Sequence, residues 1–412
     1  MKKIEAFVFC VLISAVFFSC TTLKDSDRGF SLVPENLHQE LLDSTVVSTG
    51  NNYRMKKVLE KMKSGEDVYV AALGGSVTEG LYLATYKNGY AYQFYRKLQS
   101  RFTDNGGANM HFVCAGLGGT PSIIGLIRYY KDIVQSLGHV PDLLVLEFSV
   151  NDDGSSINAR AFEQLIRQAL SADPETAVIA LYSASVSGNK SSLMIPIASH
   201  YDIPQVNVLE LYERGISGGI FTKGKYFIDH VHPKREGHNL QAECLVNIMA
   251  KISLEDMDPQ IAIPAEYHEK NPLDNFCTVG KDNQEIKIEP GSFCEVDPVT
   301  QTMKSTGKGD FPDNWRHVSG NDAFVMDVVC KNLVVAFKIP TLDLSLTYGD
   351  ADVFVDGRKV TTMKASYWNG WLHCEYAVVI DDEKSSPHHV EIKMADGHSS
   401  RFFTILAIGY NK

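Results

Sequence analysis

Short apolar runs alternate with amphipathic segments over about half of this 412-residue chain, and this alternation constrains the fold more than any other feature. The apolar runs, which we predict to be strands, are 68–73, 111–115, 143–148 and 177–182, with a shorter one at 205–208. Apolar residues at helical spacing predict helices at 90–102, 122–136, 159–170 and 236–252. Strands and helices in strict alternation indicate an α/β domain in which helices cover both faces of a parallel sheet.

The composition changes after residue 259. A proline-containing stretch follows, and we place a linker at 255–275. From 276 to 412, short β-rich runs are separated by Gly, Asp and Asn, as at 333–337, 352–355, 376–380, 389–394 and 402–408. Short strands with regular turn signals predict a second, all-β domain of the sandwich or jelly-roll type.

Three residues in two distant segments supply the parts of a serine nucleophile. Ser76 lies in Leu73-Gly-Gly-Ser-Val-Thr78, and Asp229 and His232 lie in Asp229-His-Val-His-Pro233. A serine hydroxyl attacks an ester efficiently when an imidazole takes its proton and a carboxylate orients that imidazole. We therefore predict Ser76 as nucleophile, His232 as general base and Asp229 as the residue that orients His232.

Two segments between these ends suit an oxyanion hole. They are Cys114-Ala-Gly-Leu-Gly-Gly-Thr120 and Phe148-Ser-Val-Asn-Asp152, and each follows an apolar run. Backbone N–H groups at a glycine turn and an asparagine amide can donate hydrogen bonds to the negative oxygen of a tetrahedral intermediate. Because functional groups of a parallel sheet gather beyond the carboxyl ends of its strands, we expect these segments to meet Ser76 there.

The four blocks in this order resemble the SGNH (GDSL-type) hydrolase superfamily over about residues 66–250. The resemblance implies a flavodoxin-like sheet in a catalytic domain at 51–254. It also implies that the N–H groups of Ser76 and Gly119 and the side chain of Asn151 form the oxyanion hole. The usual Gly-Asp-Ser of the family reads Gly74-Gly75-Ser76 here, and its Gly-x-Asn-Asp reads Ser149-Val-Asn-Asp152.

Each block also has a structural or other functional interpretation. A serine after two glycines is common in turns, and this one is not in a Gly-x-Ser-x-Gly elbow. The glycines at 116, 118 and 119 match neither Gly-x-Gly-x-x-Gly nor a P-loop, which argues against a nucleotide site. Asn151 and Asp152 could cap the following helix. A further set of residues could bind a metal ion, namely Asp229, His230, His232 and His238. The esterase interpretation requires neither a metal nor an organic cofactor.

The N-terminus reads as a bacterial lipoprotein signal. Two lysines precede an apolar run at 6–18, which is too short to span a bilayer as a mature helix, and Cys20 follows directly. We predict removal of residues 1–19, lipidation of Cys20, a polar tether at 20–50 and export to the outer membrane, periplasm or cell surface. An ordinary secretory signal with an incidental cysteine is the alternative.

Charge and cysteine content exclude other classes of protein. The net charge is −11, and removing two lysines and one glutamate with the leader makes it about −12, so nucleic acid would be repelled. The sequence contains no Cys-x-x-Cys pair, which is the pattern that would indicate a zinc site. Cys277 and Cys294 could form a disulfide after export, or they could be buried as thiols together with the other cysteines of the mature chain, Cys114, Cys244, Cys330 and Cys374.

We therefore expect an exported serine esterase that removes acetyl or similar small acyl groups from carbohydrate. In the C-terminal domain, Tyr367, Trp368 and Trp371 offer faces for sugar rings, although such rings also occur in cores. One alternative is a lipase or thioesterase that acts on longer acyl chains, which the apolar segment Leu81-Tyr-Leu-Ala84 near Ser76 would favour. The other alternative is a glycan-binding protein without enzymatic activity. The number of chains that associate is left open.

Overall fold

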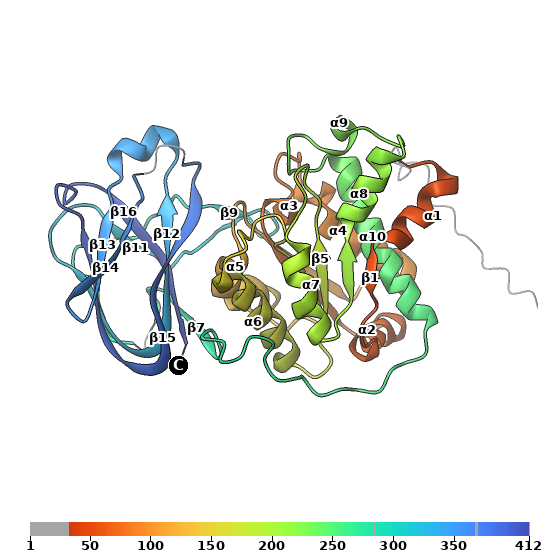
Figure 1. The fold of residues 1–412 in the computed structure, drawn as a ribbon, viewed down its shortest axis with the longest axis horizontal. Coiled ribbons are helices and arrows are strands. Elements are labelled where there is room, and N and C mark those ends of the chain that lie inside the picture. The colour runs from red at the N-terminus through yellow and green to blue at the C-terminus, as the bar shows by residue number, and fades with distance from the viewer. Residues whose placement is uncertain (1–32, 284–285, 367–369, 412) are drawn as a thin grey trace, which may run out of the picture. The chain divides into compact units, whose positions relative to one another are not determined.

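The computed structural model describes residues 33–283, 286–366 and 370–411 (Figure 1). The predicted leader, Cys20 and the first part of the predicted tether lie outside the described residues, as do Tyr367 and Trp368. No helix within the described ranges is long and apolar enough to cross a membrane.

The first domain is built on a six-stranded sheet in the order β1-β6-β5-β4-β2-β3. Its strands are β1 (Val46–Ser48), β2 (Val68–Gly74), β3 (Met110–Gly116), β4 (Leu143–Glu147), β5 (Ala177–Tyr182) and β6 (Gln205–Asn207). Neighbours from β2 to β6 are parallel, and β1 joins β6 antiparallel at the edge. The five parallel strands thus follow the order 2-1-3-4-5 of a flavodoxin-like sheet, which confirms the predicted fold class.

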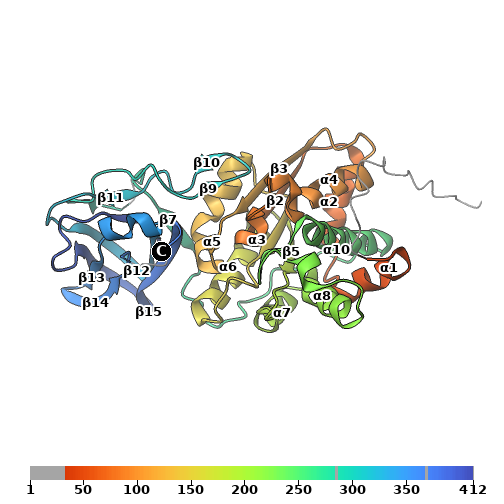
Figure 2. The same ribbon diagram turned by 90° about the horizontal axis from the view of Figure 1, so that it is seen from above.

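Helices cover both faces of this sheet (Figures 1 and 2). One face packs against α1 (Glu35–Ser44), α2 (Tyr53–Ser64), α4 (Tyr90–Phe102), α8 (Val208–Ser217) and α10 (Arg235–Leu254). The other packs against α5 (Ser122–Tyr129), α6 (Ser156–Ala172) and α7 (Ser191–His200). Within β2, Val70 and Ala72 join the first core and Ala71 and Leu73 the second, because side chains alternate along a strand.

Shorter helices complete the first domain. They are α3 (Ser76–Glu79), α9 (Lys223–Tyr226), a 3-10 turn at Tyr86–Asn88 and a π-helical segment at Tyr130–Gln135 that continues α5. The predicted helix at 122–136 is therefore an α-helix followed by a wider π-helical turn.

The predicted tether at 20–50 needs a correction. Helix α1 buries Leu41 and Leu42 in the first core, and β1 pairs with β6 through Val46 and Val206. Residues 35–48 therefore belong to the folded domain. A helix with so few buried positions and a three-residue strand leave no periodic pattern in the sequence, which explains why this segment looked aperiodic.

The second domain is an antiparallel β-domain with its own core. Its strands are β7 (Phe276–Val279), β8 (Ile288–Glu289), β9 (Thr302–Met303), β10 (Lys308–Gly309), β11 (Trp315–His317), β12 (Phe324–Ile339), β13 (Ala351–Val355), β14 (Arg358–Met363), β15 (His373–Met394) and β16 (Phe403–Asn411), with a 3-10 helix at Leu342–Thr347. Strands β12 and β15 are longer than the short strands predicted. They pair along most of their length, with shifts of register near Asn332 and Val334 that divide each into shorter apolar runs.

The segment between the domains contains no helix or strand from 255 to 275. It is fixed to α6 by the buried carboxylate of Glu163, which accepts hydrogen bonds from the N–H groups of Tyr267 and His268 and from the His268 ring. Burial alone raises the pKa of Glu163, but these bonds and one from the Tyr201 hydroxyl outweigh it and lower the pKa to about 2. The segment is therefore anchored rather than free.

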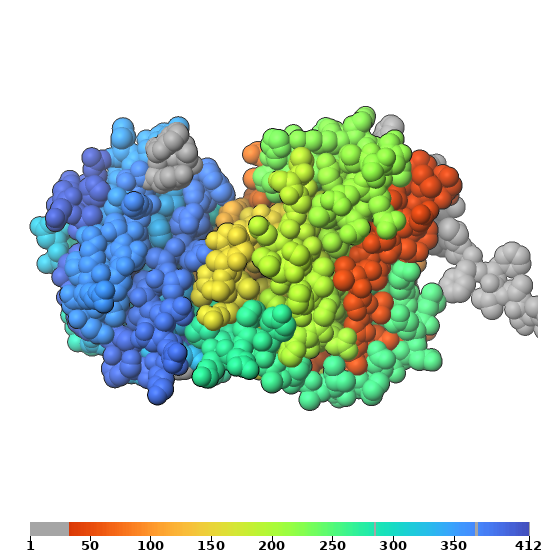
Figure 3. All heavy atoms as spheres, in the orientation of Figure 1, coloured from red at the N-terminus to blue at the C-terminus, as the bar shows by residue number. Residues whose placement is uncertain are grey.

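The two domains share one hydrophobic cluster. Phe276, Met303 and Leu406 of the β-domain pack in the same core as side chains of α5 and α6. Figure 3 shows the yellow surface of these helices lying against the blue surface of the β-domain, and α5 contacts both β7 and β16. Side chains of the β-domain thus pack together with the helices that cover one face of the sheet.

Candidate active site

Ser76 stands at the carboxyl end of β2, where the chain turns directly into α3. Only 5% of the serine is exposed. Two residues later, the Thr78 hydroxyl lies 3.0 Å from the Glu147 carboxylate and 2.8 Å from the Tyr90 hydroxyl. Burial raises the pKa of Glu147 to about 7. This buried polar contact holds the short helix that begins with Ser76.

His232 and Asp229 complete a continuous chain of hydrogen bonds with Ser76. The His232 Nε2 atom lies 2.8 Å from Ser76 Oγ, and its Nδ1 atom lies 2.7 Å from Asp229 Oδ2. The ring is largely buried and packs edge to face with Tyr82, with 5.2 Å between centroids. The structure thus brings together three residues that are up to 156 positions apart in the sequence.

The Asp229 carboxylate is held by its own loop. Its Oδ1 atom accepts hydrogen bonds from the N–H groups of Val231 and His232, each at 2.8 Å, while Oδ2 faces the imidazole. Burial alone raises the pKa of Asp229, but the bonds from the His232 N–H, the His232 ring and the Val231 N–H outweigh it and lower the pKa to about 2. Asp229 is therefore ionised at neutral pH and oriented toward His232.

Asn151 lies on the turn that follows β4, next to the residue that precedes Ser76. Its side chain packs against Gly75, where a β-carbon would collide with the Asn151 amide. This contact leaves no room for a side chain at position 75. Within the described residues, Asn151 Oδ1 has no hydrogen-bond partner.

Asp152, the next residue, does act as a helix cap, although of a different helix from the one expected. Its carboxylate accepts hydrogen bonds from the N–H and hydroxyl of Ser122, at the start of α5. Asp152 therefore caps α5 and not α6, which is the helix that follows it in the sequence.

Gly119 lies on the loop after β3, in a left-handed conformation with φ +71°. The ring of Trp371, from the β-domain, lies over it: a β-carbon at Gly119 would be 2.5 Å from the edge of that ring. Trp371 is 49% exposed and stacks on His373, with 4.4 Å between centroids. Glycine is thus required here for two reasons, the backbone conformation and the neighbouring indole.

The four residues considered as a metal site have separate roles. His238 is fully buried, and its Nδ1 atom accepts a hydrogen bond from the Tyr90 N–H. His230 Nδ1 lies 3.2 Å from Lys223 Nζ, and both nitrogens of His232 face Ser76 and Asp229. Within the described ranges, no group of three or more His, Cys, Asp or Glu side chains could hold a metal ion.

The described cysteines form no disulfide. Cys114, Cys244, Cys330 and Cys374 are buried, whereas Cys294 is exposed. Burial raises the pKa of the Cys114 and Cys244 thiols to about 12, so these two are inert packing residues.

Sequence reasoning missed several residues near the site that come from the β-domain. Gln301 donates a hydrogen bond to the Gly118 carbonyl, and Lys304 forms an ion pair with Glu79, three residues after Ser76. No sequence pattern marks these residues, because their partners are more than 180 positions away in the chain.

No protein-family model matches the sequence, and no curated protein matches it. Among solved structures, the chain is similar to two crystal structures of a two-domain esterase (CEX) active on acetylated mannans, one of them co-crystallised with mannopentaose. Both superpose with a TM-score of 0.77, at 23% and 24% identity. The matches cover 90% of this chain and 98% and 99% of those chains. The chain therefore has the fold of these two-domain esterases, with a flavodoxin-like domain followed by an all-β accessory domain.

Proposed function

We propose that the protein is a serine esterase that removes acetyl groups from carbohydrate. The observation that carries the esterase part is the hydrogen-bond chain from Ser76 through His232 to Asp229, with distances of 2.8 and 2.7 Å. Such an arrangement activates a hydroxyl for attack on an ester carbonyl, whatever the fold that holds it.

In the proposed mechanism, His232 takes the Ser76 proton as the hydroxyl oxygen attacks the acyl carbon. The Asp229 carboxylate, ionised and fixed by two backbone N–H groups, stabilises the imidazolium that forms. His232 then protonates the departing sugar oxygen. Water repeats the cycle on the acyl-enzyme and releases the acid, so that the serine regains its proton.

The proposed oxyanion hole consists of the N–H groups of Ser76 and Gly119 and the amide of Asn151. Two features support this assignment. Gly119 belongs to the loop that follows β3, next to the strand that leads to Ser76, and the Asn151 side chain packs against Gly75. Each donor of this kind contributes about 100- to 1000-fold to the rate of acyl transfer.

The carbohydrate part of the proposal is supported by the similar esterase, which is active on acetylated mannans, and by Trp371 beside Gly119. A half-exposed indole next to the reacting centre suits a sugar ring, because aromatic faces bind apolar sugar faces. Released acetate should be measured on acetylated mannans and on other acetylated polysaccharides. Hydrolysis of aryl acetate without acetate release from any polysaccharide would remove the carbohydrate part and leave the esterase part.

Replacing Trp371 by alanine should weaken binding of polymeric substrate. We expect the KM for an acetylated oligosaccharide to rise about 3- to 10-fold, because one aromatic contact with the sugar is lost. The KM for an aryl acetate should change little. Val360→Ala, at another exposed apolar position of the β-domain, serves as the control. An equal change in both KM values would mean that the indole only supports the Gly119 loop.

We also propose that the protein is exported and anchored through a lipid on Cys20, as its N-terminal sequence predicts. Cys20→Ser should move the protein from the membrane fraction to the soluble fraction and abolish incorporation of labelled palmitate. Unaltered membrane retention of the variant would refute the lipid anchor.

A further inference from the structure

A buried arginine lies behind the proposed oxyanion loop and takes no part in the chemistry described above. Arg128 belongs to α5, and its side chain is 1% exposed. An arginine is rarely so deeply buried unless it is fully paired, because its charge cannot be lost by deprotonation. The partners of Arg128 therefore indicate what it does.

On one side, the guanidinium holds both ends of the loop that contains Gly119. Its Nη2 atom donates to the Ala115 carbonyl at 3.0 Å, and its Nη1 atom lies 3.5 Å from the Thr120 hydroxyl. That hydroxyl donates in turn to the Leu117 carbonyl at 2.8 Å. The arginine thus connects the beginning and the end of the loop.

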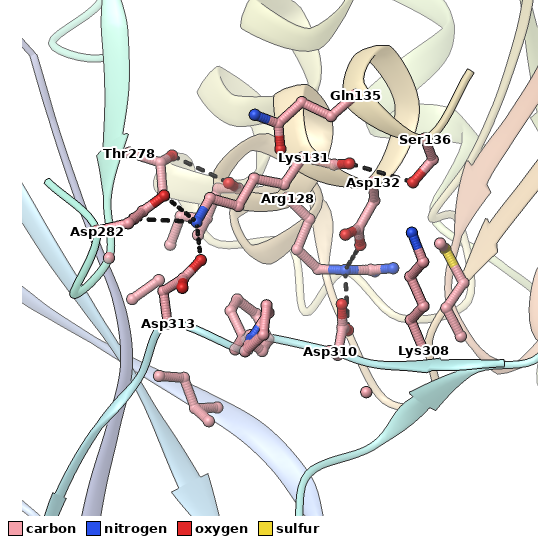
Figure 4. A pocket seen from close by; sticks show the side chains of 18 of the residues that line it. Arg128, Lys131, Asp132, Gln135, Ser136, Thr278, Asp282, Lys308, Asp310 and Asp313 are labelled. Atoms are coloured by element: carbon pink, nitrogen blue, oxygen red, sulfur yellow. Dashed lines mark hydrogen bonds and ion pairs between the residues drawn. The ribbon is translucent and has the colours of Figure 1, made fainter. Parts of the chain in front are cut away.

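On the other side, the guanidinium contacts two carboxylates from different domains. Its Nε atom lies 2.7 Å from Asp132, one turn along its own helix, and 3.3 Å from Asp310 of the β-domain. Figure 4 shows both carboxylates converging on Arg128 at one end of a cavity of about 220 Å³ between the domains. At the other end, Lys131 contacts Asp282 and Asp313.

Asp310 belongs to a segment of the β-domain, residues 300–313, that we call the arm. The arm contains β9 and β10 and contacts β3, and its Gln301 donates to the Gly118 carbonyl at 3.2 Å. The Asp310 N–H donates to the Gln301 carbonyl, so the two residues that reach the loop are themselves connected. The arm therefore supports the loop directly through Gln301 and indirectly through Asp310 and Arg128.

One positive charge faces two carboxyl groups, of which Asp310 is buried and Asp132 is partly exposed. Burial raises the pKa of Asp310 well above its usual value, and the neighbouring Asp132 raises it further, although Arg128 opposes both effects. The raised pKa of Asp310 favours its neutral form beside Arg128 and Asp132. This neutral form can be imitated by an amide.

We propose that Arg128 and Asp310 are positioning residues for the oxyanion loop, so that docking of the β-domain arm sets the geometry of the Gly119 N–H. The inference rests on the proposed esterase function. Its consequence is that the β-domain supports the chemical step as well as any contact with substrate.

The decisive comparison is between two aspartates of the arm. Asp310→Ala removes the contact to Arg128, whereas Asp313→Ala removes the ion pair with Lys131, which also joins the domains but does not touch the loop. For Asp310→Ala we expect kcat on an aryl acetate to fall about 10- to 100-fold with little change in KM, less than the loss of an oxyanion donor itself. Asp313→Ala should retain the wild-type kcat.

Asp310→Asn provides the rescue. Its amide can donate to Asp132 and accept from Arg128, as a neutral carboxyl group can, so its kcat should lie close to that of the wild type. A boronic acid that forms a tetrahedral adduct with Ser76 should bind more weakly to Asp310→Ala in proportion to the loss of kcat. If Asp310 only stabilised the fold, the affinity for the boronic acid would not fall in proportion to kcat.

Amide hydrogen exchange of residues 116–120 gives a readout that does not depend on the substrate. Exchange should accelerate in Asp310→Ala and not in Asp313→Ala. If Asp310→Ala fails to fold, Thr120→Val, which removes the hydroxyl that faces Arg128, should show the same loss of kcat and faster exchange. Equal kcat and equal exchange in both alanine variants would overturn the inference. An inactive wild type whose exchange responds as described would overturn only the esterase function.

Discussion

Ser76→Ala should lose about 10⁴- to 10⁶-fold in kcat on an aryl acetate, because the variant keeps the site but has no oxygen to attack the ester. The Ser76 Oγ atom is 2.8 Å from His232 Nε2, and only this hydroxyl is removed. The fold should survive, since the change deletes a single atom at the start of α3 and leaves the Thr78 contact with Glu147 in place.

The measurement needs two controls. Thermal unfolding should show the same midpoint for the variant and the wild type. Ser100→Ala, on the exposed side of α4, should keep full activity. A fluorophosphonate should label the wild type and not Ser76→Ala. Turnover of Ser76→Ala above a tenth of the wild-type rate would assign the nucleophile to another residue.

Asp229→Asn is expected to have the second largest effect, a fall in kcat of about 10³- to 10⁴-fold. The asparagine oxygen can still accept from the N–H groups of Val231 and His232, so the loop should keep its shape. Its NH₂ group then faces His232 Nδ1 as a donor. This stabilises the tautomer that carries its proton on Nε2, and such a ring cannot take the proton of Ser76.

His230→Ala is the matched control for this prediction. His230 lies between Asp229 and His232 but is exposed, and its ring contacts Lys223 rather than Ser76. If Ser76, His232 and Asp229 form the catalytic triad, His230→Ala should keep nearly full activity. A loss as large as that of Asp229→Asn would instead favour the interpretation of the Asp-His-Val-His segment as a metal site.

The sequence predicted the catalytic domain well where the signal was local and repeated. The helix at Tyr90–Phe102 and the strand at Ala177–Tyr182 have the predicted bounds, because the buried residues of the helix recur at helical spacing and the strand is a continuous apolar run. The parallel sheet with helices on both faces follows from the predicted alternation of strands and helices, whereas the family resemblance implied its flavodoxin-like order. The sequence did not indicate α7, where Pro196 and several serines weaken the helical pattern, or the long strands of the β-domain.

Several site residues could be named from the sequence because chemistry restricts them to a few residue types. A nucleophile, a base and an orienting carboxylate have recognisable identities, and the carboxyl ends of parallel strands give them a common location. Arg128 and Gln301 have no such signal. Arginine and glutamine serve many structural roles, and nothing near these two in the chain distinguishes them. The sequence named Trp371 as a possible sugar-binding ring but could not place it over Gly119.

What the sequence determined by itself was the layered architecture of the first domain and the residues that could perform acyl transfer, because periodicity and side-chain chemistry are properties of short segments. Only the tertiary structure placed the β-domain behind the loop that contains Gly119, and the Trp371 indole over Gly119. Those contacts join residues more than 180 positions apart, and they exist because both domains bury apolar side chains in one shared core.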